Sequence, residues 1–141
     1  MFELKFEDRL NAWQSFRKTL ETSVDPFQDV VDFYQKAPQT NIQVDPWDKA
    51  TWLDPWELLK ENLYCDFSIV LGCCYSLQLT ERFNASHCEI HIGIDREQSR
   101  SAYLLYIEDR VIGWRYDKPV FNTDIPKSFS VEKIYPMDRL N

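Results

Sequence analysis

The sequence predicts an α+β fold, in which helices occupy the N-terminal half and an antiparallel sheet the C-terminal half. Two observations predict it. As far as about residue 80, apolar residues recur every three to four positions, as on one face of a helix. From His87 onward they alternate with polar residues, as in a strand. With 141 residues, 44% of them hydrophobic, the chain is long enough for a substantial core, and we expect residues 1–141 to form a single domain.

Two helices are expected at the N-terminal end, after a short strand. Apolar and charged residues alternate from Phe2 to Phe6, which predicts the strand. Leucines and aromatic residues at helical spacing then predict a helix from Asp8 to about Thr22. Asp25 followed by Pro26 is typical of a capped helix start, and this second helix should end before Pro38.

Two Asp-Pro-Trp triplets follow, at residues 45–47 and 54–56. We interpret Asp45 and Asp54 as helix caps rather than as docking peptides, because the segment is short and aromatic and leads into a helical pattern. Glu57 completes a capping box with Asp54. This pair predicts a third helix from Pro55 to about Asn62.

The stretch that begins at Cys65 and continues to Leu79 predicts a buried central helix. Its apolar side chains lie almost all round a helical wheel, which is typical of a helix enclosed by the rest of the domain. One narrow face carries only small residues, which would let a neighbouring element approach closely: Cys65, Ser68, Gly72 and Ser76.

Period-two patterns predict a three-stranded antiparallel meander over residues 87–95, 101–107 and 111–114, with a further strand at 129–135. In the first strand, Cys88 and the isoleucines at 90, 92 and 94 point one way. His87, Glu89 and His91 point the other way. We expect the isoleucine face to pack on the central helix, and the opposite face to be solvated.

Composition and charge argue against several classes of protein. The net charge of −7, with no basic stretch, disfavours binding to nucleic acid or to an anionic membrane. The longest apolar run, Ile69 to Tyr75, is far too short to span a bilayer, and the N-terminus does not resemble a secretion signal. Four cysteines among apolar neighbours predict reduced, packed thiols in a cytosolic protein that is not secreted. No cofactor-binding motif is present in the sequence, and we expect no cofactor.

Cys65 is the one candidate nucleophile that the sequence singles out. A helix N-terminus stabilises a thiolate, although the adjacent Asp66 opposes this effect. The base would have to be His87 or His91, the only histidines of the chain. Both are expected to point away from Cys65, unless a bulge turns His87 toward the helix. The two histidines cannot bind one metal ion together, because on a strand they lie about 13 Å apart.

The order of elements, with Tyr64-Cys65-Asp66-Phe67 opening a buried helix ahead of an antiparallel meander, resembles the transglutaminase-like, papain-related core. The resemblance covers roughly residues 55–114. It implies that Cys65 takes the nucleophile position and that Asp109 stands for the aspartate that orients the base. The family's histidine would open the strand at Ser101-Ala102, so this chain lacks the catalytic histidine.

The stretch from Asp54 to Phe83 is also similar to small proteins of tailed bacteriophages, particularly those that infect cyanobacteria. This similarity implies a phage protein that acts in the virion or in the host cytoplasm, on a catalytically inert transglutaminase-like scaffold.

Two functions are compatible with these patterns. The first is a non-enzymatic protein-binding or structural domain that contacts a phage or host protein, with Trp47, Trp52 and Trp114 as the expected contact residues. These tryptophans could equally cover the core. The alternative is a cysteine hydrolase or acyltransferase with Cys65 as nucleophile and His87 as base. The oligomeric state does not follow from the sequence.

Overall fold

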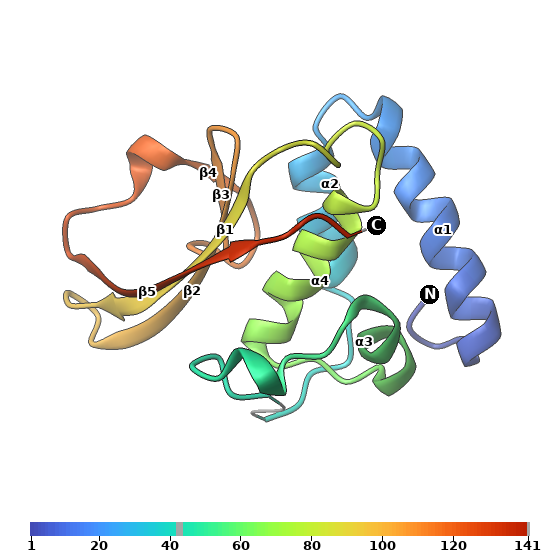
Figure 1. Cartoon of the computed structure of the whole chain (residues 1–141), viewed down its shortest axis with the longest axis horizontal. Helices are drawn as coiled ribbons and strands as arrows, with labels where there is room; N and C mark the ends of the chain where they lie inside the picture. The colour runs from blue at the N-terminus through green and yellow to red at the C-terminus, as the bar shows by residue number, and fades with distance from the viewer. Residues whose placement is uncertain (42–43, 141) are drawn as a thin grey trace.

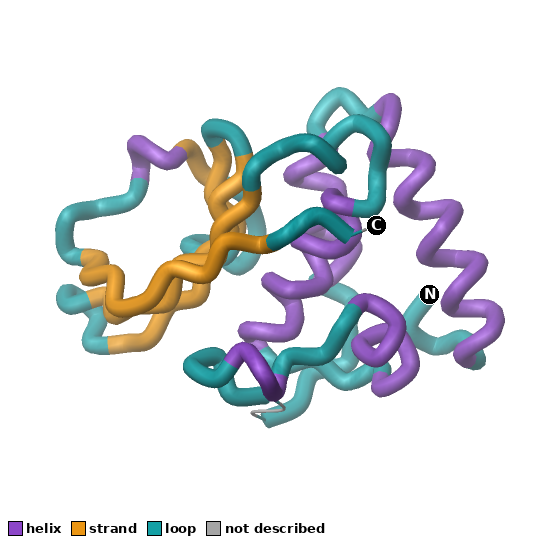
Figure 2. The backbone as a smooth tube through the Cα atoms, in the orientation of Figure 1, coloured by secondary structure: helices purple, strands orange, loops and turns teal. Residues whose placement is uncertain are grey.

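The computed structural model describes residues 1–41 and 44–140, and its helices pack against one face of an antiparallel sheet (Figures 1 and 2). The α-helices are α1 (Phe6–Thr22), α2 (Pro26–Tyr34), α3 (Pro55–Glu61) and α4 (Asp66–Gln78), with short 3-10 helices η1 (Lys49–Thr51) and η2 (Asn122–Asp124). The strands are β1 (Cys88–Asp95), β2 (Arg100–Ile107), β3 (Arg110–Ile112), β4 (Val120–Phe121) and β5 (Phe129–Met137). The predicted α+β class is therefore confirmed.

The sheet has the order β4-β3-β2-β1-β5, and every neighbouring pair is antiparallel. Figure 1 shows α4 in the middle of the molecule, beside the sheet, with α1 on the far side of the helical layer. In the described part of the chain, no helix has both the length and the apolar character needed to cross a membrane.

Proline and aspartate begin two of the helices as predicted. The Asp54 carboxylate accepts a hydrogen bond from the Glu57 amide at 2.8 Å, and the Glu57 carboxylate accepts one from the Asp54 amide at 3.0 Å. Asp25 caps α2 in the same way, through the Gln28 amide. The prediction for Asp45 is wrong. Its carboxylate accepts a hydrogen bond from the Trp47 amide in a turn, and the next helical segment, η1, is capped by Asp48 instead.

The predicted strand at Phe2 to Phe6 is also wrong, because α1 already begins at Phe6. No described strand pairs with this segment, so its backbone has no ladder to join. The alternation there has another cause. Phe2 inserts into the core, with its ring 5.5 Å from that of Tyr64, while Leu4 remains 38% exposed.

The small face of α4 receives two aromatic side chains, as the stripe of small residues predicted. A Cβ atom at Gly72 would lie 2.5 Å from the ring of Tyr34, so only glycine lets α2 approach this closely. One turn later, the Ser76 hydroxyl lies 3.0 Å from the Tyr34 hydroxyl and accepts a hydrogen bond from the Trp13 indole at 2.9 Å. The hydroxyl therefore satisfies polar groups that two other helices bring into the core.

The isoleucine face of β1 lies in the main core, which confirms the prediction. Cys88, Ile90 and Ile92 are fully buried together with the apolar residues of α4. Ile92 is paired in register with Tyr103 of β2. Ile94 is only half-buried, because it lies beyond the point between Ile92 and Gly93 where the register with β5 shifts.

The opposite face of the sheet is not simply solvated, contrary to the prediction. Gly93, Asp95 and Leu104 are buried there, under the segment that carries β4 and the start of β5. Val120 and Phe129 from that segment help to form a second, smaller core. The cover could not be foreseen, because β4 has only two residues and its position depends on contacts between distant parts of the chain.

Strand β3 ends at Ile112, two residues earlier than predicted. Gly113 turns the chain there with a φ of +112°, a conformation that favours glycine. A Cβ atom at Gly113 would lie 2.1 Å from the carbonyl oxygen of Tyr103. The turn carries Trp114 and the residues after it out of the sheet and back toward α2.

Candidate functional site

Cys65 occupies the N-cap position of α4 and is 7% exposed. Its sulfur lies 3.1 Å from the hydroxyl of Ser68, one turn further along the helix. The phenol of Tyr103 faces the same end of α4. Burial, followed by the charges of Cys65 and Asp66, raises the pKa of that phenol. A phenol whose pKa is raised stays protonated at neutral pH, so Tyr103 does not supply the base that the thiol would need.

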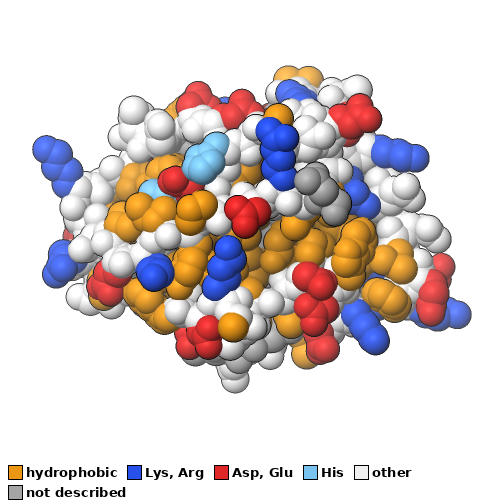
Figure 3. Space-filling view, in the orientation of Figure 1, with side chains coloured by type: hydrophobic (Ala, Val, Ile, Leu, Met, Phe, Trp, Pro, Cys, Tyr) orange, Lys and Arg blue, Asp and Glu red, His pale blue; other side chains and the backbone are white. Residues whose placement is uncertain are grey.

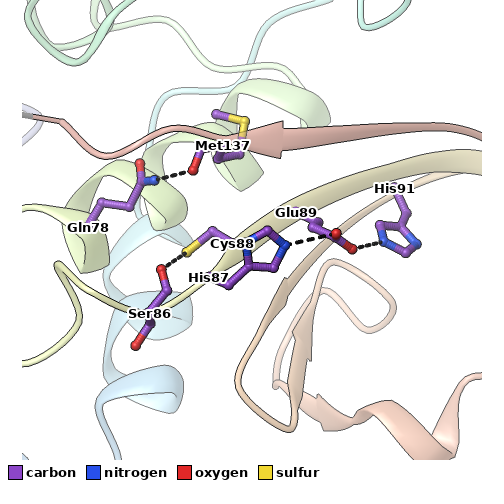
Figure 4. Close-up of polar contacts among 7 residues, drawn as sticks. All are labelled: Gln78, Ser86, His87, Cys88, Glu89, His91 and Met137. Carbon is purple, nitrogen blue, oxygen red and sulfur yellow. Dashed lines mark hydrogen bonds and ion pairs between the residues drawn. The ribbon is translucent and has the colours of Figure 1, made fainter.

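Both histidines bind the same carboxylate on the outer face of the sheet (Figure 4). His87 Nε2 lies 2.9 Å from one oxygen of Glu89, and His91 Nε2 lies 3.0 Å from the other. These two hydrogen bonds lower the pKa of the Glu89 carboxyl. The His91 ring also stacks on Tyr106 at a centroid distance of 4.0 Å, whereas the His87 side chain is 72% exposed. Figure 3 shows histidine at the surface over the sheet.

The structure does not bring Cys65 and His87 together. Cys88, the residue after His87, makes a thiol–thiol hydrogen bond with Cys74 of α4. Cys74 follows Cys65 by nine positions. Because each residue of a helix advances about 1.5 Å, the two cysteines lie about 13 Å apart along the helix axis. His87 therefore sits toward the far end of α4 from Cys65, on the opposite side of β1 from the core.

Asp109 lies at the same far end. It occupies the tight turn between β2 and β3, where the neighbouring Glu108 carboxylate accepts a hydrogen bond from the Ser86 hydroxyl at 3.3 Å. The Asp109 carbonyl accepts a hydrogen bond from the Asn122 amide, and its side chain is exposed. The cysteine-hydrolase alternative would use Cys65, His87 and Asp109. His87 and Asp109 thus lie at one end of the sheet, whereas Cys65 lies toward the other end.

The remaining thiols are sealed in the core, and none of the four cysteines forms a disulfide. Burial raises the pKa of Cys73, and the hydrogen bond with Cys88 together with burial raises that of Cys74. The same hydrogen bond lowers the pKa of Cys88, but this side chain has no exposed surface. Within residues 1–41 and 44–140, no cluster of three histidine, cysteine, aspartate or glutamate side chains could hold a metal ion.

The three tryptophans expected to contact a partner have different surroundings. Trp47 is 44% exposed. Trp52 is packed between the rings of Phe67 and Tyr135, each at a centroid distance of 4.8 Å, so it covers the core. Trp114 is half-buried, with its ring 6.0 Å from that of Phe129. Figure 3 shows apolar side chains gathered at the centre of one face, between the sheet and α3.

A cleft of about 510 Å³ opens beside the N-terminal half of α4. Its floor and sides come from the end of α2, the first turns of α4, the start of β2 and the segment after Gly113. The side chains that give it chemical character are Asp66, Arg100, Tyr103, Trp114, Arg115 and Tyr116. The volume lies within the range of small-molecule pockets.

The cleft is also lined by Ser101 and Ala102, the positions at which the resemblance would place a histidine. Trp114 is one of the predicted contact residues, whereas the two arginines and the two tyrosines of the cleft were not predicted. One signal was available. Trp114-Arg115-Tyr116 alternates aromatic and cationic residues directly after a glycine, a pattern that interfaces favour. The predicted strand at 111–114 ends inside this pattern, so the three residues were not considered together.

No protein-family profile matches the sequence, and no curated protein is significantly similar to it.

Proposed function

We propose that this chain is a non-enzymatic protein-binding domain, and that its partner occupies the cleft beside α4. The observation that carries the proposal is the cleft itself. Trp114 and Tyr116 form one of its walls, and arginines stand at its rim. Tryptophan, tyrosine and arginine are the residues that most often dominate the binding energy of protein interfaces.

Two further features support this function over the cysteine hydrolase. A hydrolase would need an imidazole within hydrogen-bond reach of the Cys65 sulfur, whereas both imidazoles bind Glu89 on the outer face of the sheet. Ser101-Ala102 stands where the resemblance expects the histidine, and alanine cannot accept a proton. A serine hydroxyl cannot take up the proton of a thiol at neutral pH.

The proposed scaffold is a transglutaminase-like core without its chemistry. The order of a buried helix that opens at Cys65 and an antiparallel sheet after it is in keeping with this proposal. In the setting that the similarity to tailed-phage proteins implies, the partner is a phage or host protein, met in the virion or in the host cytoplasm. A fold alone does not supply a function, so the proposal rests on the cleft.

The test is isolation of a stoichiometric complex. Tagged protein is expressed during phage infection, and complexes that survive size-exclusion chromatography are identified by mass spectrometry. We expect Tyr116→Ala to lose the partner, because Tyr116 is 86% exposed at the cleft and its removal should not disturb folding. Val24→Ala, a change at a fully exposed apolar residue away from the cleft, is the matched control.

Cys65→Ser should leave the complex intact. Turnover of a thioester or amide substrate by the wild type, abolished in Cys65→Ser, would instead establish the hydrolase. A stoichiometric partner that binds Tyr116→Ala as well as the wild type would remove the observation on which the proposal depends.

A further inference from the structure

The cleft has two chemically distinct parts. Its floor is apolar and is built from Val31 of α2, Ile69 and Val70 of α4 and Ile112 of β3. Its rim carries Arg100 and Arg115, both exposed. An apolar floor below a cationic rim suits an occupant with a bulky apolar group and a nearby anionic group.

The rim is held in position by α2. The Gln35 side-chain amide donates a hydrogen bond to the carbonyl of Tyr116 at 3.2 Å. The Gln28 amide donates one to the carbonyl of Asp117 at 2.9 Å. These bonds fix the segment after Gly113 against a helix before any ligand arrives, and such preorganisation reduces the entropy lost on binding.

The two arginines differ in their ion pairing. Arg100 Nε lies 3.6 Å from the carboxylate of Asp95, which is buried, and its guanidinium lies 5.7 Å from the ring of Trp114. The Arg100 side chain is still 57% exposed, so an anion in the cleft can reach its guanidinium. Arg115 makes no ion pair or hydrogen bond within residues 1–41 and 44–140.

Asp66 is the one acidic side chain that lines the cleft, against these two arginines. Asp95 already balances the charge of Arg100, so Arg115 is the cation of the cleft that has no ion-pair partner among the described residues, on a chain whose overall charge is −7. An acidic partner would be repelled by most of this surface and attracted here, so charge complementarity would direct it to the cleft.

We propose that the cleft binds a short acidic segment of a protein partner, with one bulky apolar side chain on the floor and aspartate or glutamate side chains against Arg115 and Arg100. This inference rests on the proposed protein-binding function and specifies the chemistry of the partner. A peptide suits the site better than a free small molecule, because the side-chain amides of Gln39 and Gln35 are among the groups that line the cleft, and amides pair with a peptide backbone.

The test is selection from a display library of random dodecapeptides on the immobilised, full-length protein. We expect the enriched peptides to share a bulky apolar residue flanked by aspartate or glutamate. Fluorescence anisotropy then gives the affinity of one selected peptide. Arg115→Glu should weaken its binding by at least about tenfold, and binding should weaken as salt is added.

Two further variants separate the cleft from the rest of the surface. Lys18→Glu makes the same charge change on the exposed side of α1 and should alter the affinity by less than about twofold. Ser101→Trp places a large side chain at an exposed position of the cleft wall and should abolish binding while leaving the melting temperature near that of the wild type.

Several results would overturn the proposal: no enriched sequence, enriched sequences without acidic residues, or equal binding by the wild type and Arg115→Glu. A dimer of the wild type that dissociates on Arg115→Glu, measured by sedimentation, would show that a second copy fills the cleft instead.

If the complex isolated in the preceding experiment forms equally well with Arg115→Glu and Ser101→Trp, the protein-binding function stands and this inference fails. If peptides bind as expected but no cellular complex exists, the proposed function fails and the peptide specificity stands.

Discussion

The two ends of α4 differ in how completely the rest of the molecule covers them. At the N-terminal end, Asp66 is exposed and Ile69 is half-buried along the cleft. From Val70 to Gln78, every residue of the helix is buried. The open end carries Cys65 and faces the cleft, whereas the closed end packs against the strand whose outer face carries the histidines. The thiol and the imidazoles thus belong to opposite ends of one helix, and the surface that a ligand can reach lies at the end without an imidazole.

The largest expected effect comes from the closed end. Leu77→Ala should lower the free energy of unfolding by about 2–5 kcal/mol, because Leu77 is fully buried and its removal leaves a cavity. Ile69→Ala, a similar deletion on the cleft side, should cost less than about 1.5 kcal/mol, since that side chain is already partly in solvent. Urea denaturation measures both. Equal losses would mean that the two ends of α4 are equally enclosed.

A second comparison concerns two tryptophans. Trp52→Ala should destabilise the protein by about 2–4 kcal/mol, because the indole packs between two aromatic rings. Trp47→Ala should change stability by less than about 1 kcal/mol, because this side chain is 44% exposed. Thermal unfolding followed by circular dichroism distinguishes them. A large loss on Trp47→Ala would place that residue in the core and remove it as a contact residue.

The thiols provide a third test. Alkylation of the native protein with iodoacetamide at pH 7 should be slow at Cys73 and Cys74, because both are buried and their pKa values are raised. Denaturation should make all four cysteines react at the rate of an ordinary thiol. Mass spectrometry of tryptic peptides assigns the sites. Labelling of native Cys65 faster than that of the unfolded chain would contradict the inert-thiol account and favour the hydrolase.

The smallest effect is expected on the outer face of the sheet. The pKa of Glu89 is lower in the folded state than in the unfolded chain, so its carboxylate stabilises the fold above the unfolded pKa. This contribution is lost as the pH falls through the folded value. Glu89→Gln should therefore lower the melting temperature slightly at pH 7 and leave it nearly unchanged at pH 3. A variant that is more destabilised at pH 3 than at pH 7 would reverse the sign and rule out this role.

Local chemistry made several elements predictable. The capping box of Asp54 and Glu57 depends on neighbours three residues apart, and the buried helix after Cys65 is apolar all round its axis. The small residues of this helix predicted that another element approaches it closely, but they did not predict that Tyr34 packs on Gly72. The prediction that Asp45 caps a helix was wrong because the same Asp-Pro-Trp triplet has two outcomes: it begins a helix at residue 54 and only a turn at residue 45.

The cleft was not predictable in the same way. Its lining residues, such as Val31, Ile69 and Arg100, lie far apart in the sequence. They meet Tyr116 because Gly113 turns the chain, and because Gln28 of α2 and the C-cap residue Gln35 hold the following segment. The cover over the outer face of the sheet has a similar origin, since Val120 and Phe129 pack with Ala102 and Leu104 of β2. Such features depend on tertiary contacts that no short window of sequence contains.

The account is tested most directly by the position from which a partner can be cross-linked. The photoreactive residue p-benzoylphenylalanine is placed either at Tyr116, at the mouth of the cleft, or at His87, on the outer face of the sheet, and the protein is irradiated inside the cells that produce it. We predict a covalent adduct from position 116 and none from position 87. An adduct from position 87 alone would contradict the account, because the partner would then contact the face of the sheet that carries the histidines and not the cleft.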